Sequence, residues 1–366
     1  MQITKKTEFK GFRKALSLQP EQVIDMIKIS GLKGRGGANF PTGVKWESTR
    51  KAANPNKVII CNADEGEPGT FKDKFIIKSN PEVLIEGIAI AAYAIGAKQA
   101  FIYLRAEYDY LKKKILAEIK KHKKDLDKIK LNIEIVMGAG AYICGDETAI
   151  MNSIEEIRGE PSPKPPYPVE CGLCTLPTSI NNVETLSNIP HIMLGYWKDL
   201  RLFSLSGNVE NAGVYERPLG TKAKEIIDKG KPKNKIKALF FGCAGGCVPY
   251  DPELVLDIDN IRKKGAMLGS CTIIAVDKKQ KIPKVCRNIA QFFVHESCGK
   301  CTPCREGNYR VLEILNKVIS KKAGNDDRSA LNDLADMINK TSLCGLGQAS
   351  NNHIKPALDN FRVDFI

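Results

Sequence analysis

Four cysteines near the C-terminal end of the chain constrain its fold more than any other feature of the sequence. Cys298, Cys301 and Cys304 follow one another at steps of three residues, and Cys344 stands further along in a glycine-rich turn. Three closely spaced thiolates and one distant thiolate are a common ligand set for a [4Fe–4S] cluster. The fold must therefore return the turn around Cys344 to the loop that carries the other three.

Structural zinc is the alternative for these four residues. Zinc sites usually take paired C-x-x-C knuckles or mixtures of cysteine and histidine. A C-x-x-C-x-x-C run has one thiol too many for a single knuckle, so the spacing favours the cluster. The chain has 12 cysteines, and Cys171-Gly-Leu-Cys174 is a further C-x-x-C, either redox-active or a pair of ordinary loop thiols.

The N-terminal sequence and the hydropathy pattern bear on where the protein works. We expect no signal peptide, because MQITKKTEFKGFRKAL lacks an apolar core followed by a small-residue cleavage site. The most apolar segment, 87–97, is too short to span a bilayer. We therefore expect a cytoplasmic chain without membrane insertion, whose cysteines serve metal or redox chemistry rather than disulfides.

The chain is basic, with a formal net charge of +14. Nine lysines lie between Lys112 and Lys130, interleaved with leucine and isoleucine. This spacing predicts amphipathic helices with a lysine face, which is either a solvated surface or a partner-facing patch. No zinc-finger, helix-turn-helix or aromatic RNA-binding pattern accompanies the lysines, so we expect no nucleic-acid partner.

Strands and helices alternate in the first half of the chain. Buried strands are expected at 57–61, 100–104 and 131–137, with an apolar helix at 81–97. This alternation predicts a largely parallel α/β sheet. After about residue 200, short strands with Gly/Asn turns indicate a small α+β unit, and from about Cys286 onward the pattern is helical.

Two glycine-rich turns are candidates for nucleotide binding. In the first, Gly34-Arg35-Gly36-Gly37 is followed by Lys45, which suits a phosphate, although an ordinary flexible loop has the same composition. In the second, a turn after the strand ending at Met137 leads into a helix from about Asp146. Asp146 and Glu147 at that helix start suit ribose hydroxyls or a flavin ring better than phosphate.

Polar residues also follow the strand at 57–61, where α/β sheets bind ligands. Asn62, Asp64, Glu65 and Glu67 form an acidic turn there, which a capped, solvated turn would equally explain. Further along the chain, the amides of Asn181 and Asn182 can bond a ring edge or a phosphate.

Together, six motifs resemble the flavoprotein subunit of respiratory NADH dehydrogenase, the 51-kDa type of complex I: GRGGANFPTG, CNADEGEPGTFKD, GAGAYICGDETA, SINNVETL, ESCGKCTPCREG and SLCGLGQ. The ending SLCGLGQ is more similar to the relatives found in NAD(P)-linked hydrogenases, formate dehydrogenases and flavin-based electron-bifurcating complexes. The resemblance covers residues from about 25 to 365, in the family's order.

The resemblance implies three domains. A Rossmann-like α/β domain over 1–198 would bind FMN and NAD(H) or NADP(H). A ubiquitin-like β-grasp domain over 199–282 and a helical bundle over 283–366 would follow, the latter carrying the [4Fe–4S] cluster on Cys298, Cys301, Cys304 and Cys344. We expect the chain to lack the thioredoxin-like and ferredoxin-like extensions of longer hydrogenase-type relatives.

Residue roles carry over from the resemblance motif by motif. The residues implied to hold FMN are Gly34, Arg35, Gly36, Lys45, Asn62, Asp64, Glu65, Gly145, Asn181 and Asn182. Those implied to meet the nicotinamide nucleotide are Phe40, Glu67, Tyr142, Asp146, Glu147, Lys164 and Tyr167. No side chain is expected to act as a catalytic acid or base, because the cofactor carries the chemistry, and Glu65 and Glu67 are expected to tune it.

The implied activity is hydride exchange between nicotinamide and FMN, followed by single-electron transfer to the cluster. From there electrons would pass to a thioredoxin-like [2Fe–2S] subunit and a larger iron–sulfur catalytic subunit, in a soluble complex of which bifurcating complexes are one kind. We expect Lys300 and Arg305 on the side where a partner docks. The alternatives are a non-catalytic iron–sulfur scaffold and an FMN oxidoreductase coupled to ferredoxin or quinone without nicotinamide.

Three positions depart from the family pattern. Asn39 stands where the family usually has glycine, Asp146 where it has glutamate, and Ser48 where an aromatic residue often helps to stack adenine. These departures leave the choice between NAD and NADP open.

Overall fold

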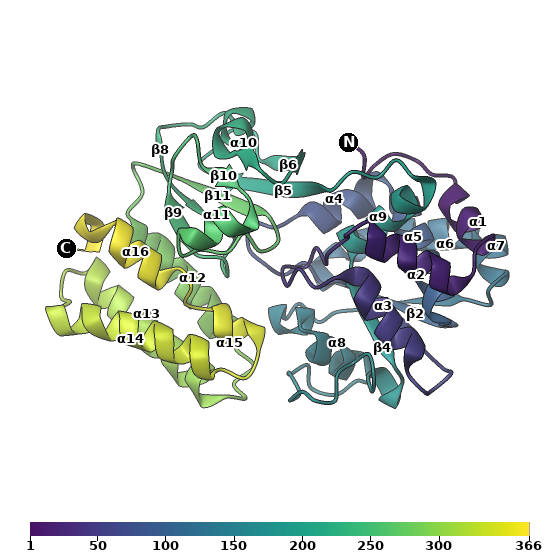
Figure 1. Ribbon diagram of the computed structural model, residues 1–366. Coiled ribbons are helices and arrows are strands. Elements are labelled where there is room, and N and C mark those ends of the chain that lie inside the picture. The colour runs from purple at the N-terminus through teal and green to yellow at the C-terminus, as the bar shows by residue number, and fades with distance from the viewer. Residues whose placement is uncertain (366) are drawn as a thin grey trace. The chain divides into compact units, whose positions relative to one another are not determined.

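The computed structural model describes residues 1–365 and divides them into two compact units. The first unit comprises Met1–Gly66 and Phe71–Asp199, and the second comprises Glu67–Thr70 and the chain from Leu200 onward (Figure 1). Residues 67–70 therefore lie within the sequence of the first unit but pack with the second.

A parallel sheet of four strands forms the centre of the first unit. Its order is β3 (Asn132–Met137), β2 (Gln99–Leu104), β1 (Val58–Ala63) and β4 (Thr178–Asn182), and each neighbouring pair is parallel. This confirms the parallel α/β sheet predicted from the sequence. The strand order reverses between β1 and β4, and the carboxyl ends of strands at such a reversal are where open α/β sheets bind ligands.

Helices precede, connect and follow these strands. They are α1 (Lys10–Leu16), α2 (Pro20–Ile29), α3 (Thr42–Lys51), α4 (Lys72–Ser79), α5 (Pro81–Ile95), α6 (Lys112–Lys121), α7 (Lys123–Asp127), α8 (Glu147–Ile154) and α9 (Val183–Leu194), with 3-10 turns η1 (Ala106–Leu111), η2 (Tyr142–Gly145) and η3 (Leu173–Thr175). The apolar helix α5 packs against β1, β2 and α9. Gly87 permits that packing, because a side chain there would collide with the backbone oxygen of Leu186 in α9.

Strand β4 is the element of this sheet that the sequence pattern does not reveal. Its sequence, Thr-Ser-Ile-Asn-Asn, holds one large apolar residue, yet its first four residues are buried. Burial is possible because the polar side chains are hydrogen-bonded within the strand: Asn181 Nδ2 donates to Ser179 Oγ at 3.1 Å.

The second unit begins with a mixed sheet. Its order is β6 (Gly213–Pro218), β5 (Leu200–Gly207), β11 (Thr272–Asp277), β8 (Ile236–Phe240) and β9 (Cys247–Pro249). The pair β5 and β11 is parallel and the other pairs are antiparallel. Beside the sheet lie α10 (Ala223–Gly230), α11 (Ile258–Lys263) and the short pair β7 (Thr221–Lys222) and β10 (Val255–Leu256). Residues such as Phe203, Ile226 and Ile273 form its apolar core.

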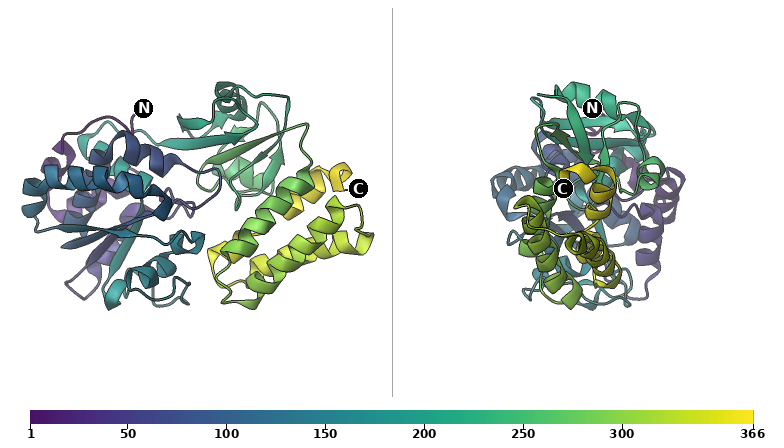
Figure 2. Two further views of the ribbon diagram at one scale, coloured as in Figure 1. Left: turned by 180° about the vertical axis from the view of Figure 1, so that it is seen from behind. Right: turned by 90° about the vertical axis from the view of Figure 1, so that its left-hand side faces the viewer.

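Helices complete the second unit, as the sequence pattern predicts. They are α12 (Ile282–Glu296), α13 (Thr302–Ile319), α14 (Asn325–Thr341), α15 (Gly345–Ala349), α16 (Ile354–Asn360) and the 3-10 turn η4 (Arg362–Phe365). Helix α13 packs between α12 and α14 (Figure 2). Gly307 allows α13 to approach α14, because a Cβ there would lie 2.5 Å from Ile338 Cγ1. Within residues 1–365, no helix combines the length and apolar character needed to cross a bilayer.

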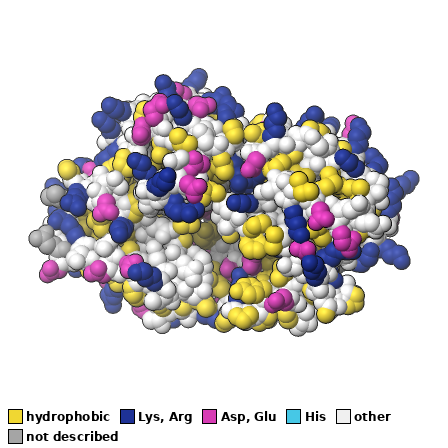
Figure 3. Space-filling model, viewed as in Figure 1, with side chains coloured by type: hydrophobic (Ala, Val, Ile, Leu, Met, Phe, Trp, Pro, Cys, Tyr) yellow, Lys and Arg dark blue, Asp and Glu magenta, His cyan; other side chains and the backbone are white. Residues whose placement is uncertain are grey.

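Positive side chains are widely spread on the face of the protein that Figure 3 shows. Lysine and arginine side chains are scattered over the visible face and interleaved with acidic ones (Figure 3). Helices α6 and α7 carry the lysine-rich segment and bury Ile115 and Leu126, which confirms the predicted amphipathic helices.

Candidate functional site

The end of β1 and the second glycine turn lie side by side in the first unit. Asn62 Nδ2 donates to Gly145 O at 2.9 Å, and Asp64 N donates back to Asn62 Oδ1 at 3.0 Å. A Cβ placed on Gly145 would be 3.7 Å from Asp64 O. The fold thus brings together Asn62, Asp64 and Gly145, three residues expected at the flavin, beside the reversal of strand order.

The first glycine loop lies against the start of α9, which follows β4. Gly34 N donates to Phe40 O at 2.9 Å and closes the loop, while Arg35 N donates to Thr185 Oγ1 at 2.9 Å. A Cβ on Gly36 would come within 3.5 Å of Asn182 Cβ. The backbone of this loop is therefore held at the other strand of the reversal, at a helix N-terminus that favours an anion.

Arg35 provides the test of whether this loop suits a phosphate. Its side chain is 1% exposed, and Nη2 pairs with Asp199 Oδ1 at 2.5 Å. Its Nε and Nη1 have no hydrogen-bond partner among the described residues. Buried donors are normally satisfied, and a guanidinium fork matches phosphate oxygens well. The loop therefore fits the phosphate of FMN.

The side-chain amides of Asn181 and Asn182 are occupied by the protein itself. Asn181 Oδ1 accepts from the buried Trp46 Nε1 at 3.2 Å. Asn182 caps α9 by accepting from Glu184 N at 2.9 Å, and its Nδ2 donates to Asp73 Oδ2 at 2.6 Å. These amides therefore fix β4, α3 and α4 around the end of the strand.

Lys72 is a buried cation that sequence reasoning missed. Its Nζ lies 2.8 Å from Asp73 Oδ1, 3.1 Å from Glu184 Oε2 and 3.2 Å from Asn182 Oδ1. Burial opposes the charge, but the carboxylates of Asp73 and Glu184 outweigh it and raise the pKa of Lys72. The available signal was the Phe-Lys-Asp run that ends the acidic turn, since a lysine is buried only when it is paired.

Glu65 lies in the same buried network. Its carboxylate accepts from Asp73 N at 2.8 Å, Lys74 N at 3.0 Å and Tyr108 Oη at 3.0 Å. Burial, reinforced by Asp73, raises the pKa of Glu65 to about 7. Its side chain therefore caps the start of α4. With this pKa, the carboxyl group changes between its neutral and charged forms near neutral pH.

Glu147 lies between two lysines that were expected at the nicotinamide and flavin sites. Lys164 Nζ is 2.8 Å from Glu147 Oε2, and Lys45 Nζ is 3.5 Å from Glu147 Oε1. Burial acts to raise the pKa of Glu147, but the two lysines outweigh it and lower it. Lys45 also donates to Ile180 O at 2.9 Å, which ties this charged group to β4.

Two of the aromatic residues expected at the nucleotide are about half exposed. Phe40 is 50% exposed and Tyr167 is 53% exposed, so each presents a large ring surface. Tyr142 lies against Gly66, where a Cβ would come within 2.9 Å of Tyr142 Cδ2. Exposed rings of this kind suit stacking on a nucleobase.

Glu67 makes its contacts inside the second unit. Its carboxylate accepts from Ser270 Oγ at 2.8 Å and from Ala244 N at 3.4 Å. A side chain on Gly242, whose φ is +61°, would collide with the same carboxylate. The structure thus packs Glu67 against the loops that follow β8 and precede β11.

The four cysteines of the expected cluster lie near one another in the second unit, because Cys298, Cys301 and Cys344 all influence the pKa of Cys304. Cys304 lies in the first turn of α13 and Cys344 precedes α15. Burial raises the pKa of Cys304 to about 11; a hydrogen bond from Ser297 opposes the rise, and Cys301, Cys344 and Cys298 add to it. Asn308 Nδ2 approaches Cys304 Sγ at 3.4 Å. Hydrogen bonds to the sulfurs are one means by which proteins set a cluster's potential.

The spacing of the sulfurs bears on the choice between a cluster and zinc. A tetrahedral zinc with Zn–S bonds of about 2.3 Å holds its sulfurs roughly 3.8 Å apart. Among the described residues, no three of these cysteines have sulfurs within 4.8 Å of one another. The sulfurs are thus not gathered as a bound zinc would hold them, and it is the sequence spacing of the four cysteines that favours a cluster.

Two basic residues, Lys300 and Arg305, stand beside the expected cluster ligands in the sequence. Arg305 is exposed, and its Nη1 donates to Gly299 O at 2.6 Å, which braces the loop between Cys298 and Cys301. Lys300 is exposed as well. Cys171 and Cys174 lie exposed in the loop before β4 of the first unit.

Two family models match the chain. The Nuo51 FMN-binding domain matches residues 27–191, and the NADH-ubiquinone oxidoreductase-F iron–sulfur binding region matches residues 284–366. The first match contains the glycine turns and the β1 and β4 ends, and the second contains all four cysteines.

Full-length similarity extends to curated proteins. The F 2 subunit of the NADH-quinone oxidoreductase of Rhizobium meliloti is 39% identical, over 98% of this chain and 91% of that protein. The F subunit of the Aquifex aeolicus NADH-quinone oxidoreductase is 41% identical, over 96% of this chain and 87% of that protein. The HndC subunit of the NADP-reducing hydrogenase of Solidesulfovibrio fructosivorans is 36% identical, over 98% and 78%.

A solved structure has the same fold over nearly the whole chain. A subunit chain of an NAD⁺-reducing [NiFe]-hydrogenase in the H₂-reduced state superposes with a TM-score of 0.91 at 34% identity. The match covers 98% of this chain and 64% of that one, so the hydrogenase chain is longer.

Proposed function

This chain belongs to the family of the F subunit of NADH-quinone oxidoreductases, and we propose that it exchanges hydride with a nicotinamide nucleotide in its first unit and electrons with partners through its second. It is an oxidoreductase subunit with an FMN-binding domain and a [4Fe–4S] region. We assign a Rossmann-like domain to 1–198, a ubiquitin-like β-grasp domain to 199–282 and a cluster-bearing helical bundle to 283–366. The parallel sheet, the mixed sheet with α10, and helices α12–α16 support this division.

The reversal of strand order between β1 and β4 carries the proposal. Asn62, Asp64 and Gly145 meet on one side of it, and the glycine loop with the buried Arg35 is held on the other. We assign FMN to this place, held by Gly34, Arg35, Gly36, Lys45, Asn62, Asp64, Glu65, Gly145, Asn181 and Asn182. FMN supplies the hydride acceptance and the stepwise release of electrons that no side chain here provides.

Different parts of this set have different tasks. The hydrogen bond from Arg35 N to Thr185 fixes the backbone of residues 34–36. This backbone binds the FMN phosphate together with Nε and Nη1 of Arg35, which have no partner among the described residues. Asn181, Asn182 and Glu65 position the elements around the cofactor, because their side chains are already hydrogen-bonded to protein.

The nicotinamide nucleotide is assigned to the exposed aromatics and the charged group on α8. Phe40 and Tyr167 stack on the adenine, and Glu147, held by Lys164, accepts hydrogen bonds from ribose hydroxyls. Tyr142, Asp146 and Glu67 complete the set. Asp146 acts by capping α8.

The second unit is proposed to deliver electrons to the rest of a complex. Cys298, Cys301, Cys304 and Cys344 hold the [4Fe–4S] cluster, which supplies single-electron transfer. Lys300 and Arg305 form the surface where an iron–sulfur partner docks, and the partners are a thioredoxin-like [2Fe–2S] subunit and a larger iron–sulfur catalytic subunit. We infer a cytoplasmic setting, which suits a chain whose reduced thiols bind iron.

Anaerobic titration of the purified chain tests the proposal. We expect bound FMN, about four iron atoms per chain, bleaching of the flavin absorbance by NADH or NADPH, and viologen reduction. Bound FMN that neither nucleotide bleaches would support coupling to ferredoxin or quinone instead. Flavin-loaded protein without viologen activity would indicate a scaffold, and zinc at the cysteines would overturn the cluster assignment.

A single aromatic variant tests the nucleotide site separately. Phe40→Ala removes the proposed adenine stack, so KM for the nucleotide should rise about tenfold while FMN content stays unchanged, since stacking on a base contributes roughly 1–3 kcal/mol. Tyr110→Ala is the matched control, because Tyr110 is similarly exposed but lies in η1. Equal KM values for the two variants would contradict the assignment of Phe40.

A further inference from the structure

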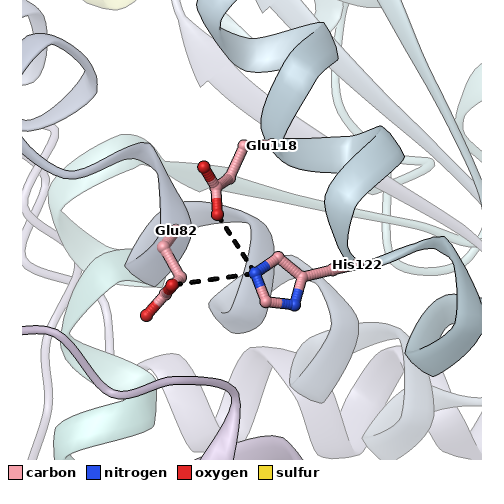
Figure 4. A group of neighbouring side chains, drawn as sticks. All are labelled: Glu82, Glu118 and His122. Carbon is pink, nitrogen blue, oxygen red and sulfur yellow. Dashed lines mark hydrogen bonds and ion pairs between the residues drawn. The ribbon is translucent and has the colours of Figure 1, made fainter.

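Three side chains with metal-ligand chemistry converge in the first unit, and none of them belongs to the residues assigned to FMN, the nucleotide or the cluster. Glu82 lies in the first turn of α5, Glu118 lies in α6, and His122 lies at the C-terminal end of α6 (Figure 4). One ligand atom from each lies within 4.8 Å of the others. His122 Nε2 is 3.0 Å from Glu118 Oε1 and 3.7 Å from Glu82 Oε2.

Contacts outside the trio hold two of these ligands in place. Glu82 Oε1 accepts from Glu8 N at 2.7 Å and Thr7 N at 3.3 Å, so Oε2 is directed at His122. The imidazole of His122 stacks on Phe9 with ring centroids 3.8 Å apart and planes within 7°. Preorganised ligands of this kind reduce the cost of binding a metal.

The remaining ring nitrogen of His122 faces a carboxylate. Asp125 Oδ2 lies 3.9 Å from His122 Nδ1, and Asp125 is itself bound by Lys128 Nζ at 2.6 Å. Metal-binding histidines usually have a carboxylate or carbonyl at the second nitrogen, which selects the tautomer that presents Nε2. At 3.9 Å Asp125 is beyond hydrogen-bond distance from Nδ1, so in this structure it contributes negative charge beside the ring and makes no hydrogen bond to it.

A lysine occupies the open side of the trio. Lys121 Nζ lies 2.8 Å from Glu118 Oε1 and 3.1 Å from Glu82 Oε2, while its side chain is 57% exposed. Glu82 and His122, in contrast, have side chains that are 7% and 10% exposed. The lysine therefore reaches in from solvent toward two carboxylates and can swing out when another cation arrives.

The donor set determines which cation fits. Two carboxylate oxygens and one imidazole nitrogen suit zinc, manganese or ferrous iron, and they leave further positions for water. Lys121 can neutralise only one of the two carboxylates, whereas a divalent ion matches both. We propose that Glu82, Glu118 and His122 bind a divalent first-row transition metal that displaces Lys121 and fastens residues 7–9 to α5 and α6.

Manganese is the probe that separates this site from the 12 cysteines of the chain, because Mn²⁺ prefers oxygen and nitrogen donors to thiolate. The flavin-loaded protein with its cluster oxidised is titrated with Mn²⁺, and the loss of the free-ion EPR signal reports binding. We expect saturation at one equivalent. His122→Gln should weaken binding at least about tenfold, since even outer-shell changes cost 10–100-fold at metal sites.

A lysine variant tests the site in the opposite direction. Lys121→Met removes the competing cation, so Mn²⁺ should bind several-fold more tightly than to the unaltered protein. Lys113→Met is the matched control, because Lys113 is an exposed lysine of the same helix, and it should leave the affinity unchanged. Neither substitution touches the core.

Three results would overturn the proposal. The first is the absence of saturable binding, which would make the trio an ion-pair network closed by Lys121. The second is equal affinity in the unaltered protein and in correctly folded His122→Gln, as judged by far-UV circular dichroism and FMN content. The third is unchanged affinity in Lys121→Met, which does not depend on any ligand variant folding.

Discussion

The side chain of Glu65 shows how a residue assigned to a cofactor can act by positioning the protein around the assigned site. Both of its oxygens are already used by the start of α4 and by Tyr108. The expectation that Glu65 tunes the flavin stays a prediction, and the structure adds a positioning role. A carboxylate in a motif is ambiguous in sequence, because ligand binding and helix capping select the same residue types.

Replacing Glu65 tests that positioning role. Glu65→Ala leaves two backbone N–H groups and a tyrosine hydroxyl unpaired in the interior, which should lower the free energy of unfolding by about 2–4 kcal/mol. Glu65→Gln keeps an acceptor and should lose less than half of that. Urea denaturation monitored by circular dichroism measures the difference, and equal losses in both variants would argue against the capping contacts.

The cysteine furthest from the others in sequence tests the cluster assignment. Cys344→Ser should retain FMN and flavin bleaching by the nucleotide but lose most of the iron and the electron transfer to an iron–sulfur partner. Cys171→Ser is the control, because Cys171 is exposed in the first unit. The iron content of this variant should equal that of the unaltered protein. Loss of FMN together with the iron would show that the second unit also supports the first.

At the scale of elements, α8 explains one departure from the family pattern. Asp146 stands where the family usually has glutamate, and its carboxylate caps α8 by accepting from Thr148 N at 2.8 Å and Ala149 N at 3.3 Å. Aspartate is among the best N-cap residues, so the shorter side chain secures the helix that presents Glu147.

Two substitutions separate capping from charge at this helix. Asp146→Ala should lower the free energy of unfolding by about 1 kcal/mol, whereas Asp146→Asn, which is an equally good cap, should change it little. Thermal and urea unfolding of the two variants provide the comparison. A loss in Asp146→Asn as large as in Asp146→Ala would mean that charge, rather than the cap, stabilises the helix start.

An element can be predicted from sequence when local apolar patterns stabilise it, and cannot when contacts between distant residues do. Strands β1 and β2 and helix α5 carry largely apolar runs, and β3 alternates before its apolar end, so local sequence is sufficient for these elements. Strand β4 is buried although mostly polar, because its side chains bond to Trp46 and to one another. For Lys72 the adjacent Asp73 is a local signal, but no local pattern reveals its second partner, Glu184, more than a hundred residues away.

At the scale of the whole chain, two buried carboxyls predict how stability changes with pH. Burial raises the pKa of both Glu65 and Glu86 to about 7, above their usual value of 4.5. The folded state therefore holds more protons than the unfolded state between these values. Stability from these groups is complete below about pH 4.5 and is lost as the pH rises through 7.

Measurement of unfolding at pH 5.5 and at pH 8 should show this loss. We expect the free energy of unfolding to fall by a few kcal/mol over the interval, and Glu86→Gln to flatten the dependence, since glutamine does not titrate. Glu82 and Glu147, whose pKa values are lowered, contribute with the opposite sign at more acidic pH. A wild-type stability that increases from pH 5.5 to pH 8 would contradict the raised pKa values.

The four residues Glu67–Thr70 have a consequence for how such a protein can be divided or recombined. They belong to the second unit by their contacts, although the first unit's chain continues on both sides of them. The polypeptide thus passes between the units three times, and a single cut near residue 199 leaves Glu67 without Ser270. A gene fusion that exchanges the second unit for that of a relative must therefore also exchange this tetrapeptide, so that Glu67 keeps a matching partner at Ser270.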